Sequence, residues 1–216
     1  VRGAAVDDAV MAAAEAYVRH SFTLDSDPAP FLALVAGDPV FAAIVTPYMG
    51  LRPVLYPQPF EALIGAIIGQ QITTAFAAKV KRALYDLAGR HITIDGVSYP
   101  LLPEPAAIAA LAEGDLLARQ FSRQKAAAVQ GVARAVAEGA LDFAALAALP
   151  PDEAIARLTQ HKGVGRWTAE CVLMRGLGAQ DAIPAGDIGL RAAIGRAYGL
   201  GRHATEAEVR ERAAGW

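Results

Sequence analysis

The sequence is poor in cysteine, because Cys171 is the only one among its 216 residues. A single thiol excludes an internal disulfide, a zinc site built from cysteines and an iron–sulfur cluster held by four cysteines. It favours a reducing, cytoplasmic location. No apolar run approaches the roughly 18 residues that cross a bilayer, and the first residues lack a signal-peptide pattern, so we expect no membrane partner. Without an initiator methionine, the numbering is expected to start inside a longer gene product.

Charge is also sparse, and its distribution is uneven. Only 19% of the residues are charged, and the formal net charge of -2 gives no support to a polyanionic partner. Residues 1–60 carry three basic side chains against six acidic ones, whereas residues 161–216 carry eight against six. The segment 119–134 holds four basic residues and no acidic one. These clusters are explained either by solvated helix faces or by local contacts to an anion.

Hydrophobic residues are abundant, at 54% of the chain, which predicts a full core in one compact unit or in two lobes sharing a cleft. Alanine- and leucine-rich stretches separated by Pro, Gly and Asp are typical of helices. Strands are expected only at 91–100, where Asp95-Gly96 can turn a small hairpin. The helices are predicted at 6–20, 38–48, 59–69, 73–88, 105–111, 122–138, 151–160, 166–177, 188–198 and 205–213.

The first break in the helical pattern is a glutamine pair. The run EALIGAIIG, residues 61–69, is apolar until it meets Gln70 and Gln71, and a new helix follows behind the hydroxyls of Thr73 and Thr74. A glutamine pair at such a corner can touch a ligand or can simply face water. This stretch alone favours glutamines that face water.

The second break is the glycine-rich turn within HKGVGRWTAE, residues 161–170. Helical patterns precede and follow it, so we predict a tight turn that joins two helices. Glycines there expose backbone N–H groups at a helix start and let a phosphate approach closely, which is typical of an anion site. An ordinary helical hairpin explains the pattern equally well. The residues predicted to form the anion site are Lys162, Gly163, Val164, Gly165, Arg166 and Thr168.

An aspartate precedes a later helix. In PAGDIGLR, residues 184–191, the chain reaches Asp187 just before an apolar helical pattern. An Asp in this place is commonly an N-cap. The same position holds the carboxylate ionised near backbone donors, where it can stabilise a cation that develops beside it. The two roles are compatible.

Taken together, LIGAIIGQQIT, GVGRWTAECVLMRGLG and PAGDIGLR resemble the helix-hairpin-helix superfamily of DNA glycosylases, and most closely its 3-methyladenine DNA glycosylase II branch. The resemblance runs from about residue 55 to the end. It implies an all-α fold in which two helical lobes flank a DNA-binding cleft. It places the central lobe at about 60–160 and the second lobe at 1–59 plus 161–216. The helix-hairpin-helix is expected at 151–178, and no extra N-terminal α/β domain is expected.

The resemblance also assigns roles to individual residues. Asp187 corresponds to the catalytic aspartate, and the hairpin to a clamp on one DNA phosphate. Trp167 stands where lyase members carry an attacking lysine, so strand cleavage through a Schiff base is not expected. Trp167 and Cys171 are then expected to line the pocket for the flipped base. Backbone carbonyls of Thr159, His161 and Val164 are expected to hold a monovalent Na or K ion, with no further cofactor required.

The implied activity is that of a monofunctional glycosylase acting in base excision repair. It would flip 3-methyladenine or 7-methylguanine out of double-stranded DNA, hydrolyse the N-glycosidic bond and leave an abasic site. The expected partner is DNA and the expected state is a monomer. Two alternatives stay open: excision of other lesions, such as hypoxanthine or ethenoadenine, or a non-catalytic DNA-binding module.

Three positions depart from the family pattern. Gln71 stands where alkylpurine relatives often carry a leucine wedge, so the plug that replaces the flipped base is polar. Cys171 replaces an aromatic residue found in some relatives, which implies a roomier pocket, although a small buried apolar residue is the favoured explanation. The chain stops at Trp216, where relatives usually continue into a closing helix.

Overall fold

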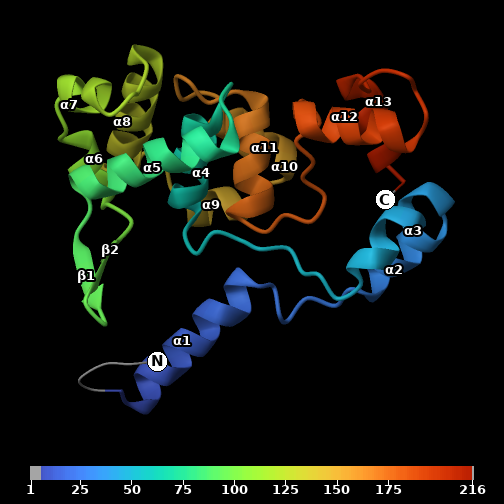
Figure 1. The fold of residues 1–216 in the computed structure, drawn as a ribbon, viewed down its shortest axis with the longest axis horizontal. Coiled ribbons are helices and arrows are strands. Elements are labelled where there is room, and N and C mark those ends of the chain that lie inside the picture. Colours follow the sequence, from blue (N-terminus) through green and yellow to red (C-terminus); the bar gives the residue numbers. More distant parts are fainter. Residues whose placement is uncertain (1–5, 216) are drawn as a thin grey trace. The chain divides into compact units, whose positions relative to one another are not determined.

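The computed structural model describes residues 6–215, which form helices and one two-stranded sheet. The predicted all-α class is confirmed (Figure 1). Trp216, beyond which a closing helix was expected, lies outside the described residues. None of the helices in this part of the chain has the length and apolar character needed to cross a membrane. The helices are α1 (Asp8–Ser21), α2 (Ala29–Ala36), α3 (Pro39–Val45), η1 (Thr46–Tyr48), α4 (Pro59–Gly69), α5 (Thr74–Ala88), α6 (Pro105–Ala109), α7 (Glu113–Ala118), α8 (Arg123–Ala137), α9 (Phe143–Ala147), α10 (Pro151–Leu158), α11 (Arg166–Arg175), α12 (Ile188–Ala197) and α13 (Glu206–Ala213).

The chain divides into two compact units. Unit 2 is continuous and spans Gln58–Ala182, whereas unit 1 combines the described residues up to Pro57 with those from Ile183 onward. The predicted lobe boundary at residue 161 therefore moves to Ala182. The reason is packing, because α11 lies against α4 and α10, and its Val172 and Leu173 join the core of unit 2.

Helix α4 is the centre of unit 2. Pro59 occupies its first turn, where a missing N–H costs nothing. The helix is apolar around its circumference, and Leu63, Ile64 and Ile67 are fully buried. It packs against α5, α8 and α11 (Figure 1). Burial of each such side chain contributes about 1.5–3 kcal/mol, so this helix dominates the core of the unit.

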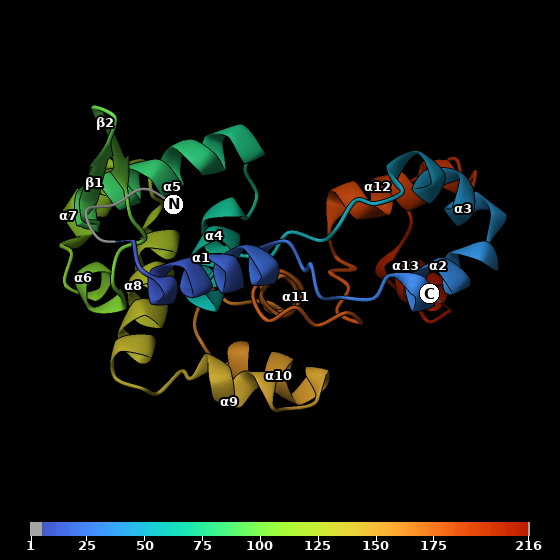
Figure 2. The same ribbon diagram turned by 90° about the horizontal axis from the view of Figure 1, so that it is seen from below.

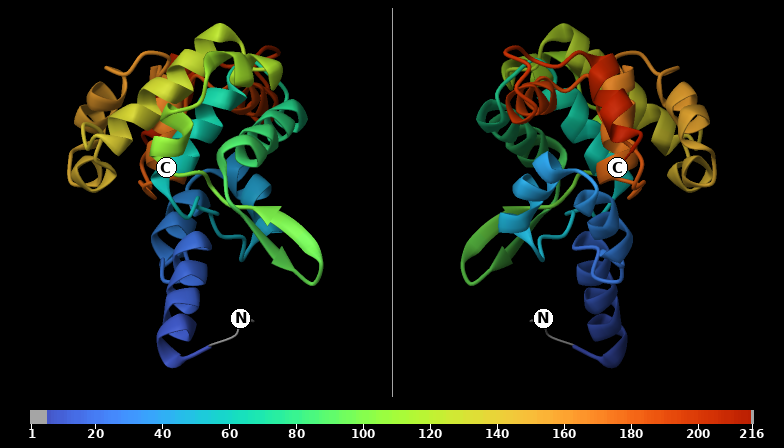
Figure 3. Two further views of the ribbon diagram at one scale, coloured as in Figure 1. Left: turned by 90° about the vertical axis from the view of Figure 1, so that its left-hand side faces the viewer. Right: turned by 90° about the vertical axis from the view of Figure 1, so that its right-hand side faces the viewer.

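The strand hairpin predicted at 91–100 is confirmed. Strand β1 (His91–Ile94) pairs antiparallel with β2 (Val97–Pro100), and both turn residues between them adopt positive φ angles. Figure 3 shows the hairpin extending away from the helices of unit 2. Helices α9 and α10 lie together in the same unit, on the side away from the hairpin (Figure 2).

Unit 1 is held by a few polar contacts and a small apolar core. Its core contains Ile194 from α12 and Val209 from α13. The Tyr198 hydroxyl donates to the carboxylate of Asp38, which also caps α3, and this hydrogen bond lowers the pKa of Asp38. The guanidinium of Arg212 lies 4.0 Å from the centre of the Tyr198 ring. These contacts join segments that are distant in sequence.

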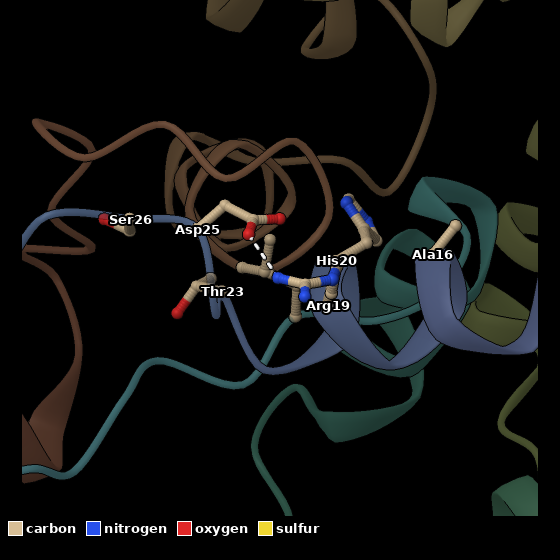
Figure 4. Close-up of a pocket in the computed structure, with 7 residues that line it drawn as sticks. Ala16, Arg19, His20, Thr23, Asp25 and Ser26 are labelled. Carbon is tan, nitrogen blue, oxygen red and sulfur yellow. Dashed lines mark hydrogen bonds and ion pairs between the residues drawn. The ribbon is translucent and has the colours of Figure 1, made fainter. Parts of the chain in front are cut away.

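Helix α1 ends beside a shallow pocket in unit 1. Arg19, in the last turn of the helix, forms an ion pair with Asp25 at 2.7 Å (Figure 4). It forms a second ion pair with Glu15 at 2.8 Å. Because two carboxylates pair with this one guanidinium, the pocket carries no uncompensated positive charge from Arg19. This pocket lies outside every segment that carried a predicted site residue.

Several short elements differ from the sequence-based expectation. Helix α2 and helices α7 and α9 were not predicted. The segment 38–48, expected as one helix, breaks into α3 and η1, because Pro47 cannot donate a backbone hydrogen bond inside a continuing helix. Short helices carry too few periodic positions to stand out in the sequence.

Candidate functional site

The glycine-rich turn joins α10 to α11, as predicted. The backbone N–H of His161 donates to the Leu158 carbonyl at 3.1 Å, and that of Val164 donates to the His161 carbonyl at 3.0 Å. The Val164 side chain is 5% exposed and belongs to the core of unit 2. The buried Val164 side chain therefore anchors the turn, while the glycines on either side of it are exposed.

Gly163 is required for a reason other than the predicted one. Its φ is +85°, and a Cβ built on it would lie 2.4 Å from the Cβ of Ala128 in α8. The hydrogen of this glycine therefore faces another helix, not an approaching phosphate. The expectation that Gly163 leaves space for an anion is wrong. It allows the turn to pack closely on α8.

Gly165 has the open environment expected of an anion site. It is the N-cap of α11 with φ -88° and ψ 174°, and no side chain caps the helix there. A Cβ built on Gly165 meets no heavy atom within 4 Å. The first amides of α11 point out of the helix start, and the positive end of the helix dipole lies with them. Lys162 is exposed in the same turn.

Thr168 cannot offer its side chain to a phosphate at the surface. It is 1% exposed, and its hydroxyl accepts a hydrogen bond from the Gln70 side-chain amide at 2.9 Å. The same amide donates to the Gly163 carbonyl at 2.9 Å. The expected phosphate contact of the Thr168 hydroxyl is therefore replaced by an internal one.

The glutamine pair divides between two roles. Gln70 joins the end of α4 to the hairpin turn through hydrogen bonds within the protein. It therefore matches neither expectation for the pair, contact with a ligand or exposure to water. Gln71 is exposed and has a φ of +57°, a backbone conformation that non-glycine residues adopt infrequently. The two neighbours thus point to different surroundings, and only Gln71 faces solvent.

Arg166 is engaged within the protein. Its Nε donates to the buried carboxylate of Glu170 at 2.9 Å, and its Nη2 lies 3.3 Å from Asp152 at the start of α10. The hydrogen bond to Glu170 raises the pKa of the guanidinium. Arg166 therefore links the two helices of the hairpin, while just over half of its side chain remains exposed.

Trp167 and Cys171 lie one helical turn apart on α11 and both are half-buried. Their spacing places them on one face of the helix. The neighbouring positions Thr168, Ala169 and Val172 are buried on the other face. The indole is not sealed inside the protein, and the alternative of a fully buried Cys171 does not describe the observed exposure.

Asp187 is the N-cap of α12, in unit 1. Its Oδ1 accepts a hydrogen bond from the backbone N–H of Leu190 at 2.9 Å, and its own N–H donates to the Pro184 carbonyl at 2.8 Å. A Cβ on Gly189 would lie 3.1 Å from the same carboxylate oxygen, so the glycine leaves room for it. The predicted capping role is confirmed, and the carboxylate has a fixed orientation.

The chemistry of the hairpin carbonyls can be compared with the needs of a monovalent cation. The expected donors are backbone oxygens of Thr159, His161 and Val164, which are hard ligands of the kind that such ions prefer. The His161 carbonyl already accepts one hydrogen bond, yet a carbonyl oxygen has two lone pairs. Within residues 6–215, no cluster of three His, Cys, Asp or Glu side chains forms a metal site.

One contact beside the glutamine pair was missed in the sequence. Lys125 of α8 donates to carbonyls at the end of α4, next to the glutamine pair. The only signal was its place in the basic segment 119–134 without a nearby acid. That pattern also fits a solvated helix face, so the contact could not be inferred.

The comparisons with known proteins agree in one respect. A model of the HhH-GPD superfamily of base excision DNA repair proteins matches residues 64–216. A DNA-3-methyladenine glycosylase of Bacillus subtilis is 33% identical over 93% of this chain and 66% of its own length. DNA-3-methyladenine glycosylase 2 of Escherichia coli is 33% identical over 61% of this chain and 46% of its own. The chain thus spans about half to two thirds of these two relatives.

Solved structures agree as well. The 3-methyladenine DNA glycosylase of Archaeoglobus fulgidus superposes with a TM-score of 0.84 at 27% identity, over 97% of this chain and 71% of that one. The Schizosaccharomyces pombe 3-methyladenine DNA glycosylase, solved in complex with abasic DNA, gives a TM-score of 0.70 at 26% identity. That match covers 85% of this chain and 92% of that one.

Proposed function

This chain belongs to the HhH-GPD superfamily of base excision DNA repair proteins, and we propose on that premise that it is a DNA glycosylase that removes alkylated purines from DNA. The names of the similar proteins from Bacillus subtilis and Archaeoglobus fulgidus support 3-methyladenine as a substrate. The observation that carries the proposal is the fixed carboxylate of Asp187 at the N-terminus of α12. The finer proposal includes 7-methylguanine as a second substrate.

In this proposal the hairpin holds one phosphate of double-stranded DNA. The open N-cap at Gly165 supplies backbone amides, and Lys162 adds a mobile charge. Arg166 contributes through its electrostatic field and not through a direct hydrogen bond to the phosphate, since Glu170 and Asp152 hold its guanidinium. Contacts of this kind position the protein on DNA without reading the sequence. A Na or K ion on the carbonyls of Thr159, His161 and Val164 would add positive charge there.

The chemistry needs no protonation of the leaving base. A 3-methyladenine or 7-methylguanine base is already cationic, so the electrons of the C1′–N bond leave with the base and neutralise it. The deoxyribose becomes an oxocarbenium-like cation, and the Asp187 carboxylate lowers the energy of that cation. Water adds its oxygen to C1′ and gives up one proton, leaving an abasic site. The hydrogen bond from Leu190 keeps the carboxylate oriented for this role.

Trp167 is proposed to stack on the flipped base. Cation–π attraction favours a charged alkylated base over a neutral one by about 0.5–2 kcal/mol, which is modest discrimination. Cys171 lies one turn away on the same face of α11, and its small side chain is proposed to leave more room for the base. Because position 167 holds no amine, we propose hydrolysis without strand cleavage. The proposed form is a monomer acting on DNA in the cytoplasm.

The decisive experiment replaces Asp187 by Asn. Asn caps a helix as well as Asp does, so this change removes the charge and keeps the cap. We expect release of 3-methyladenine from methylated duplex to slow by about 100-fold or more, as for loss of one preorganised electrostatic group. Product is measured as alkali-labile abasic sites after single-turnover reaction. Asp142→Asn, at the N-cap of α9, is the matched control.

Equal rates for the parent and Asp187→Asn would contradict the catalytic role. A panel with hypoxanthine and ethenoadenine separates the alternative lesions. Nicking of DNA without alkali would contradict the monofunctional proposal. Salt-dependent DNA binding without any abasic product would identify the non-catalytic module instead.

A further inference from the structure

Lys125 occupies an unusual position for a lysine. It lies in the first turn of α8, and its Nζ donates to the carbonyls of Ile68 and Gln70, both at 2.7 Å. These carbonyls belong to the C-terminal end of α4, which packs against α8 (Figure 1). Cations stabilise helix C-termini in this way, because the last carbonyls lack partners within their own helix.

The surroundings of Lys125 hold its charge on those carbonyls. Among the described residues, no carboxylate forms an ion pair with it, and burial lowers the pKa of its ammonium group. A partly desolvated ammonium group whose hydrogen-bond acceptors are backbone oxygens has little freedom to choose other partners. The lysine therefore fixes the direction in which the chain leaves α4.

The residue that leaves α4 in this direction is Gln71. Gln70 carries the carbonyl bound by Lys125, and its side chain reaches the Gly163 carbonyl and Thr168. Gln71 follows at once, exposed and with a φ of +57°. A non-glycine residue keeps this sparsely populated backbone conformation only if the surrounding structure holds it there. Lys125 and the Gln70 side chain both hold the residue that immediately precedes Gln71.

We infer that Lys125 is a positioning residue for Gln71, holding the turn after α4 so that the Gln71 side chain is preorganised to enter the duplex where a base has been flipped out. This inference rests on the proposed glycosylase function. It extends the site to α8, which was not assigned any part in the reaction. Preorganisation of this kind lowers the entropic cost of insertion.

The test measures insertion apart from chemistry. A duplex carrying a stable tetrahydrofuran abasic analogue, with 2-aminopurine as the base opposite, reports by fluorescence on a side chain that enters the gap. We expect Lys125→Met and Gln71→Ala each to reduce the fluorescence change by at least about fivefold, and the double variant to lose no more than the larger single effect, since residues acting as one unit are not additive. Lys79→Met, on the exposed face of α5, is the charge-matched control and should retain the signal.

Excision adds a second readout. Single-turnover release of a correctly paired lesion should slow by about tenfold in Lys125→Met, whereas release of the same lesion from a mismatch should stay within about threefold, because a mismatched base flips with less help. Lys125→Arg, which keeps the charge and the donors, should lie near the parent. It also provides the comparison if thermal melting shows that Lys125→Met does not fold.

The outcomes separate this inference from the proposed function. Additive effects of the two substitutions on insertion, or equal slowing on paired and mismatched lesions, would overturn the role of Lys125. A parent protein that inserts Gln71 in a Lys125-dependent way but releases no base would leave the inference standing and overturn the glycosylase. A parent protein that releases base, together with insertion that Lys125→Met does not affect, would support the glycosylase and overturn the inference.

Discussion

The turn after α10 and the turn before α12 carry the two halves of the proposed chemistry, and they are held in place by different means. The hairpin turn at 161–165 is fixed from outside by Gln70 of α4 and by close packing on Ala128 of α8. The turn at Asp187 is fixed from within, by hydrogen bonds to Pro184 and Leu190. The hairpin turn thus depends on contacts with residues far away in the sequence, whereas the Asp187 carboxylate depends on its immediate neighbours.

The sharpest way to break the long-range arrangement is Gly163→Ala. The new Cβ would lie 2.4 Å from the Cβ of Ala128, and the residue must also keep a φ of +85°. We expect the free energy of unfolding to fall by about 3 kcal/mol, from overpacking together with backbone strain. Denaturant titration measures the loss. Ala128→Gly should recover the part due to packing, and an unchanged midpoint for Gly163→Ala alone would refute the account.

A substitution two residues later separates binding from stability. Gly165→Asp provides the missing side-chain cap of α11, so stability should be equal or higher. Its carboxylate would occupy the place proposed for the phosphate, and DNA affinity at low salt should fall by about tenfold, or about 1.4 kcal/mol. Fluorescence anisotropy with undamaged duplex measures it. Gly165→Ser, which caps without a charge, is the control, and equal affinities for the two variants would exclude a phosphate at this turn.

The local arrangement at Asp187 should give the smallest effect on stability. Asp187→Ala removes the bond from Leu190 and should cost about 1 kcal/mol, while Asp187→Asn should cost almost nothing. Hydrogen exchange of the α12 amides reports on this unit directly. A large loss in both variants would mean that the carboxylate has a structural partner beyond the cap, and the contrast between the two turns would disappear.

This contrast explains what could be predicted from the sequence. The cap at Asp187 and the turn at Gly163 follow from residue types within a few positions, and they were predicted together with the strand hairpin at Asp95-Gly96. The bond from Gln70 to Thr168 joins residues 98 positions apart, and no local pattern indicates it. The predicted role of Gly163 was wrong for the same reason. The residue that it packs against, Ala128, is an ordinary helical alanine that no local pattern marks as a contact.

The helix-hairpin-helix and its family were indicated by the resemblance of three sequence motifs to known glycosylases, whereas the boundary between the two units was not predicted correctly. The segment 161–182 was placed in the second lobe, yet the apolar side chains of α11 are buried with those of α4. Which of two cores receives a helix with buried side chains depends on shape complementarity, since both cores offer the same kind of apolar surface. Composition cannot distinguish them.

The discontinuous layout of unit 1 has a consequence for biosynthesis. Unit 2 is one uninterrupted stretch, so it can collapse while the ribosome is still adding residues, as N-terminal domains commonly do. Unit 1 cannot be completed until Tyr198 has been made and reaches back 160 positions to Asp38. The earlier segment must therefore wait with apolar side chains uncovered. Nascent chains stalled before Ile183 are the ones expected to need a chaperone.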